Sequence, residues 1–187
     1  MRTGITAVLL ILLMLPSASL ANPGWFMTFT NPDLDRCFIE PGTGSVTVYV
    51  VSRFGEGISG TRFRLVPDPG LHWQYVGESI PDFGFWVNAV TGNSADGIVL
   101  EGAWSDGPVV LLAVEYLATD IPEPCARLRI EPFPGALSGT AEVRLSDDQW
   151  IVPLFVYDLA AKPCASWCEL SNPVQTGTWG AIKALYQ

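Results

Sequence analysis

The sequence predicts an all-β protein: a two-sheet antiparallel sandwich of about nine to ten strands, followed by a short C-terminal amphipathic helix. Short runs rich in β-branched and aromatic residues recur along the chain, and 18 glycines and 15 prolines separate them. No stretch before residue 175 has the periodicity of an amphipathic helix. These observations favour one sandwich domain with a helical tail.

The first 21 residues predict a signal peptide. Arg2 supplies the positive start, residues 7–15 form an unbroken apolar run, and Ser19-Leu20-Ala21 has the small residues that signal peptidase needs. The apolar run is too short to span a bilayer comfortably. We therefore expect a secreted, periplasmic or cell-surface protein with no transmembrane segment after cleavage.

The sandwich domain is expected over residues 22–159. In the run 58–65, Arg62 and Arg64 alternate with Phe63 and Leu65, a pattern that places the arginines on the solvent side of a strand. The predicted strands are 25–30, 45–52, 58–65, 72–76, 83–87, 97–103, 109–117, 126–130, 141–145 and 151–157.

Two C-terminal segments follow the sandwich. Residues 160–177 are polar, small and cysteine-containing, which predicts a linker loop, and residues 178–187 predict a helical tail capped by Thr178. A helix of about nine residues is marginal alone, so it needs a surface to lie against. The tail either packs on its own domain or frays, or it is a portable docking or sorting tag. Its candidate docking residues form one apolar stripe: Trp179, Ile182, Leu185 and Tyr186.

The charge of the chain excludes some partners. Removing Arg2 from the ten basic residues leaves nine against 19 acidic residues, a net charge of −10. Nucleic acid and anionic membrane surfaces would repel such a protein. The expected partner is therefore a protein or a polysaccharide.

Four cysteines remain after cleavage: Cys37, Cys125, Cys164 and Cys168. An even number of cysteines in an exported chain favours two disulfides, and three pairings are open. A zinc site would need more ligands at close spacing, and His72 is the only histidine. We expect neither a metal nor a cofactor.

Catalysis is not expected. His72 lies in the strand-like run LHWQY and is interpreted as structural, and there is no GxSxG motif. Two carboxylate pairs, Glu78 with Asp82 and Glu101 with Glu115 on neighbouring predicted strands, leave a secreted glycoside hydrolase as the least favoured alternative.

Residues 31–35 (NPDLD) imitate the start of a calcium-binding EF-hand loop. Arg36 stands where the loop needs glycine, and Gly42 stands where it needs glutamate. A turn held by Asx hydrogen bonds is the better interpretation. An irregular site that adds Asp147 and Asp148 stays open.

Aromatic residues gather in the middle of the chain. Exposed tryptophans on a sandwich can stack on sugar rings, whereas packing between the sheets is the ordinary role of such residues. The alternation in 83–87 puts Trp86 on the opposite face from Phe83 and Phe85. The candidate ligand-binding residues are Trp86, Trp73 and Trp104.

Two runs resemble a cohesin domain: VTVYVVSRFGEGISGTRFRLVPDPGL (46–71) and GIVLEGAWSDGPVVLLAVEYLATD (97–120). The resemblance implies a nine-stranded jelly-roll sandwich, a fold shared with some carbohydrate-binding modules. Cohesins use one sheet face of this sandwich to bind dockerin modules. No residue of that binding face transfers one by one. The chain also resembles exported bacterial proteins with an N-terminal aromatic strand followed by a cysteine, and its ending resembles the T/S-W-G-x-I-K-x-L-Y endings of exported proteins of some environmental bacteria.

The cohesin resemblance also bears on the disulfides. It places the first and last strands side by side, so it implies a bridge from Cys37 to Cys164 or Cys168, with Cys125 taking the remaining partner. The competing arrangement is Cys37–Cys125 with Cys164–Cys168.

The sequence thus favours an exported, non-catalytic binding or adhesion module for a protein or glycan ligand. The alternative is a structural subunit of an extracellular assembly that docks through its C-terminal tail. Fold alone does not decide between them.

Overall fold

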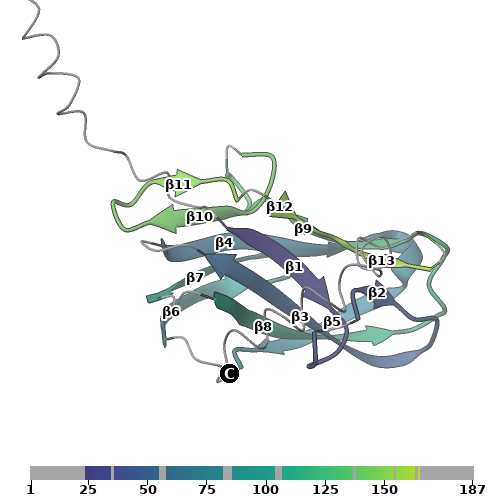
Figure 1. The fold of residues 1–187 in the computed structure, drawn as a ribbon. Coiled ribbons are helices and arrows are strands. Elements are labelled where there is room, and N and C mark those ends of the chain that lie inside the picture. Colours follow the sequence, from purple (N-terminus) through teal and green to yellow (C-terminus); the bar gives the residue numbers. More distant parts are fainter. Residues whose placement is uncertain are drawn as a thin grey trace, which may run out of the picture.

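The chain folds as two β-sheets packed face to face, as predicted (Figure 1). The computed structural model describes residues 24–34, 36–54, 58–81, 86–103, 107–136, 138–153, 155–162 and 164. The predicted signal peptide and helical tail lie outside these residues.

The first sheet has five strands in the order β12-β1-β3-β8-β5. Its longest strand pairing is the antiparallel one between β3 and β8, which runs from Gly44 opposite Ala118 to Phe54 opposite Gly107. The strands are β1 (Trp25–Phe29), β3 (Gly44–Phe54), β5 (Trp73–Ser79), β8 (Gly107–Ala118) and β12 (Phe155–Val156).

The second sheet has the order β11-β10-β4-β9-β13-β2, and β7 adds to β4 and pairs with β6. Strand β4 is its centre because it pairs with β10, β7 and β9. Figure 1 shows β10 and β11 at one end of the molecule and β2 and β13 at the other. The strands are β2 (Phe38–Ile39), β4 (Ile58–Pro67), β6 (Trp86–Asn93), β7 (Gly97–Ala103), β9 (Arg127–Glu131), β10 (Glu142–Leu145), β11 (Trp150–Ile151) and β13 (Leu159–Ala161).

Several predicted boundaries differ from the structure. Strand β6 runs from Trp86 to Asn93, well beyond the predicted end at 87, and the predicted strand 151–157 divides into β11 and β12. Strand β13 continues to Ala161, past the predicted end of the sandwich. The two-residue strand β2 was not predicted, because a strand this short carries no alternation.

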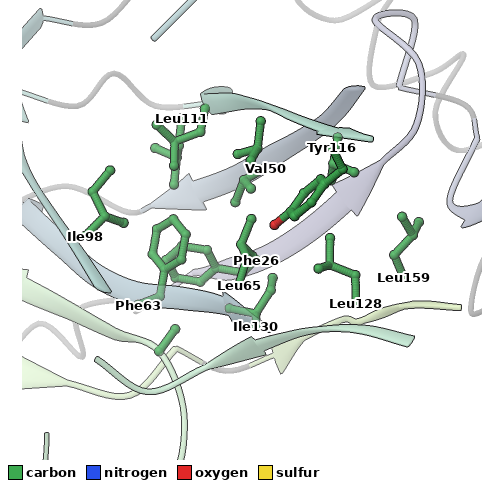
Figure 2. Packing of buried hydrophobic residues seen from close by; sticks show 14 of the residues in the cluster. Phe26, Val50, Phe63, Leu65, Ile98, Leu111, Tyr116, Leu128, Ile130 and Leu159 are labelled. Atoms are coloured by element: carbon green, nitrogen blue, oxygen red, sulfur yellow. The ribbon is translucent and has the colours of Figure 1, made fainter. Parts of the chain in front are cut away.

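The core lies between the sheets. Figure 2 shows Val50, Leu111 and Tyr116 of the first sheet opposite Phe63 and Ile130 of the second. These side chains are buried. On β3 and β4 the intervening positions point away from the core, whereas β8 places the adjacent Leu111 and Leu112 in it, beside its irregular register with β3. Alternation on β4 therefore follows the prediction.

One disulfide joins two loops at the edge of the sandwich. Cys125 and Cys164 are bonded, with their Cα atoms 5.0 Å apart. This pairing is one of the two that the cohesin resemblance implies, and it rules out the competing Cys37–Cys125 arrangement. Cys37 is also disulfide-bonded.

Candidate functional site

The outer face of the second sheet carries five arginines from three strands. On β4 the side chains of Phe63 and Leu65 are buried, so Arg62 and Arg64 point outward, as predicted. Register continues this row onto the neighbouring strands, because Arg62 is opposite Glu142 and Arg64 is opposite Glu131. We call this surface the arginine face; its arginines are Arg62 and Arg64 of β4, Arg127 and Arg129 of β9, and Arg144 of β10.

Carboxylates hold four of these arginines in place. Arg62 pairs with Glu142, whose side chain is only 7% exposed. Arg144 lies 2.9 Å from Glu101 of β7. The remaining pairs form one chain across β4 and β9: Arg64 to Glu131 (2.6 Å), Glu131 to Arg129 (2.6 Å), and Arg129 to Asp68 (2.9 Å).

Two aromatic rings lie on the same face. The guanidinium of Arg62 is 4.1 Å from the ring centre of Trp150 on β11 and 5.9 Å from that of Phe133. Arg144 is 5.7 Å from the Trp150 ring. Arginine over an aromatic face is favourable by about 0.5–1 kcal/mol at an exposed site. The ring and the ion pairs together fix the direction of these arginines.

Arg127 differs from the other four arginines of the face. Its side chain is exposed, and its backbone N–H donates to Asp68. The nearby carboxyl of Asp158 accepts a hydrogen bond from the Ile130 N–H; burial raises its pKa, although that bond and the charges of Arg127 and Arg129 act in the opposite direction. The face thus combines four arginines held in ion pairs with Arg127, which is exposed and forms no ion pair within the described residues.

The carboxylate pairs considered for catalysis serve other purposes. Glu101 and Glu115 do not lie on neighbouring strands, so this expectation was wrong: β7 belongs to the second sheet and β8 to the first. Glu101 forms an ion pair with Arg144, and Glu78 accepts a hydrogen bond from the backbone N–H of Ser94. Asp82 lies outside the described residues.

The predicted turn after the first strand has Asx hydrogen bonding. The side-chain oxygen of Asn31 accepts a hydrogen bond from the backbone N–H of Arg36, with 2.9 Å between the oxygen and the nitrogen. Within the described part of the chain, no group of three or more His, Cys, Asp or Glu side chains is placed to hold a metal ion. His72 caps the short 3-10 helix Pro69–Leu71 in a left-handed conformation rather than lying in a strand.

The structure gives one candidate tryptophan a packing role. Trp73 is 8% exposed, and its ring centre lies 5.2 Å from that of Tyr116, which is the packing alternative considered above. Trp86 begins β6 opposite Ala103, but its side chain is not among the parts that the structure describes. Trp104 lies outside the described residues.

The remaining site candidates also fall outside the described residues. They are Cys168 and the tail residues Trp179, Ile182, Leu185 and Tyr186.

Only part of the arginine face could be predicted from the sequence. Arg62 and Arg64 stand out because they alternate within one strand. Arg127, Arg129 and Arg144 join them through strand pairing across about 60–85 residues of chain, which no local pattern reveals. Alternating arginines in the run 127–131 were the available signal.

The comparisons with known structures match cohesin modules. The second type II cohesin module of the adaptor ScaA scaffoldin of Acetivibrio cellulolyticus, solved with its long C-terminal linker, has a TM-score of 0.53 at 11% identity, covering 83% of this chain and 98% of that one. A type II cohesin domain from the cellulosome of the same organism has a TM-score of 0.50 at 11% identity, covering 76% and 96%. The chain has a cohesin-like fold.

This likeness concerns the fold alone, since the identity is low. No protein-family model matches the sequence, and no curated protein matches it. No helix within the described residues is long and apolar enough to cross a membrane. The cohesin-like fold confirms the sandwich predicted from the two sequence runs.

Proposed function

We propose that this protein is an exported, non-catalytic docking module that binds a protein partner through the arginine face. The carrying observation is the gathering of five arginines and Trp150 on one sheet face of a chain whose net charge is −9. Arginine and tryptophan are enriched among residues that dominate binding energy at protein interfaces. The cohesin-like fold supports a partner held on a sheet face.

The ion pairs suit this role. Partly buried pairs contribute little net stability, but they hold guanidinium groups in one orientation before a partner arrives. The fitting partner presents carboxylates for Arg127 and a pocket or an aromatic side chain for Trp150. A surface of this kind favours charge-steered association that weakens as salt is added.

The experiment is affinity capture from the culture medium and surface extract of the producing organism, with the mature protein as bait. The variants Arg127→Glu and Trp150→Ala are each compared with a matched control: Arg36→Glu makes the same charge change at an exposed site outside the face, and Trp150→Phe keeps an aromatic ring. We expect one protein to be captured by the wild type and both controls, and lost with both test variants.

A glycan array of the same proteins, with Trp86→Ala and Trp104→Ala added, distinguishes a polysaccharide ligand from a protein partner. Binding of a polysaccharide that survives Arg127→Glu but is lost in Trp86→Ala or Trp104→Ala would contradict the proposal and favour the aromatic glycan site. Equal capture by all five proteins would contradict it as well.

A further inference from the structure

The outer face of the five-stranded sheet carries an apolar cluster separate from the core. Register makes it continuous over three strands, because Met27 lies opposite Val51 and Val51 lies opposite Val110. We call it the outer patch. Its buried members are Phe29, Cys37, Val51 and Val110, and its partly buried rim is Trp25, Met27, Leu34 and Tyr49.

The outer positions of a strand on a water-facing sheet are ordinarily polar. A contiguous apolar patch at these positions therefore indicates a contact surface for another segment or partner. The opposite sheet face is the charged arginine face. The two outer surfaces of the sandwich therefore have different chemistry and suit different partners.

Cysteine pairing identifies a segment that is tied to the patch. Cys125 is bonded to Cys164, and Cys37, a buried member of the patch, is also disulfide-bonded. The chain has four cysteines, so the intramolecular partner left for Cys37 is Cys168. That bond would anchor the C-terminal segment directly in the outer patch.

The path of the chain fits this bond. Strand β13 runs parallel to β2, with Ala160 opposite Phe38, so the chain approaches its last described residue, Cys164, beside the strand that follows Cys37. Lys162 confirms the proximity, with its ammonium 4.0 Å from the Phe38 ring centre. The four residues from Cys164 to Cys168 reach about 13–14 Å when extended.

We propose that the segment 169–187 folds back on its own domain and covers the outer patch with the apolar stripe of Trp179, Ile182, Leu185 and Tyr186. The eleven residues from Cys168 to Trp179 span up to about 36–40 Å, so the tether allows the stripe to return to the patch. Anchoring raises the local concentration of a helix that is too short to be stable alone. The occupant is the chain's own tail, independently of what binds the arginine face.

Met27 on the rim provides a direct measurement. It is the only methionine after residue 21, so its oxidation by peroxide adds one oxygen atom to the intact mass without ambiguity. In the full mature chain, Trp179→Ala and Leu185→Ala should each speed this oxidation about fivefold or more, because the cover opens locally. Lys183→Ala, off the stripe, should leave the rate unchanged.

Two further measurements test the Cys37–Cys168 bond and the identity of the occupant. Peptide mapping without reduction should find Cys37 joined to Cys168, and any other partner overturns the tether. Cross-linking in an equal mixture of ¹⁴N- and ¹⁵N-labelled chains should give only unmixed tail-to-sheet products. Mixed products would assign the tail to a second copy and overturn docking within one chain, as would equal Met27 oxidation in all variants.

Discussion

At the scale of single residues, the pair of Arg62 and Glu142 is the most sensitive point of the arginine face. Glu142 is nearly buried, and Arg62 supplies its charge partner. Arg62→Met leaves an unpaired carboxylate, so we expect a loss of about 3 kcal/mol in the free energy of unfolding, measured by urea denaturation. Adding Glu142→Gln should restore much of it. A single-variant loss below about 1 kcal/mol would show that Glu142 is compensated from elsewhere.

Tyr116 behaves differently because its hydroxyl is buried in the core without a hydrogen-bond partner among the described residues. Burial raises its pKa far above the ordinary value of 10.0, with smaller contributions from Tyr75 and Glu78. The folded state therefore favours the neutral phenol. Its contribution to stability is complete below pH 10 and is lost as the pH rises above it, where the unfolded chain ionises.

Tyr116→Phe tests this directly. Removing an unsatisfied buried hydroxyl should leave stability at pH 7 unchanged or raised. Between pH 9 and about 11, the variant should lose less stability than the wild type, since one ionising group is gone. Urea unfolding at several pH values measures both. An equal alkaline loss in the two proteins would contradict the assignment.

At the scale of elements, the hairpin of β6 and β7 depends on a glycine. Gly92 has a φ of +83°, and an added Cβ would collide with the carbonyl oxygen of Gly97. Gly92→Ala should therefore cost about 2–4 kcal/mol. Gly77→Ala on β5 is the control, because no atom lies within 4 Å of its added Cβ; it should change stability by no more than about 0.5 kcal/mol. Similar losses in both variants would mean that strand propensity, not the turn, is responsible.

The strands also show where sequence reasoning succeeds. Alternation in β4 correctly predicted that Phe63 is buried and Arg62 is on the outer face, because apolar and polar residues alternate along a half-buried strand. Strands β2 and β13 pair over only two residues, which is too short for an alternating pattern to show in the sequence. The pairing of β4 with β9 and β10, which assembles the arginine face, depends on contacts across the whole fold and was not predictable locally.

At the scale of the whole molecule, the Cys125–Cys164 bond closes a loop with a sequence separation of 39 residues. Cross-linking a loop of that length stabilises by about 4 kcal/mol in the chain-entropy model. The double variant Cys125→Ala and Cys164→Ala should lose about this much, measured by urea denaturation. A loss near zero would indicate that the unfolded chain is already restricted.

The two outer sheet faces differ in chemistry: the arginine face carries ordered charge and the Trp150 ring, and the outer patch is apolar. We propose a protein partner for the first face and the chain's own C-terminal tail for the second. Half of the ten arginines and lysines of this strongly acidic chain lie on the arginine face.

The most direct measurement is the dissociation constant of the captured partner for the wild type, Arg127→Glu and Arg36→Glu, by calorimetry at low and physiological salt. Docking through the arginine face predicts at least tenfold weaker binding for Arg127→Glu, about 1.4 kcal/mol, and less than twofold for Arg36→Glu. Equal dissociation constants for the two variants would contradict the account.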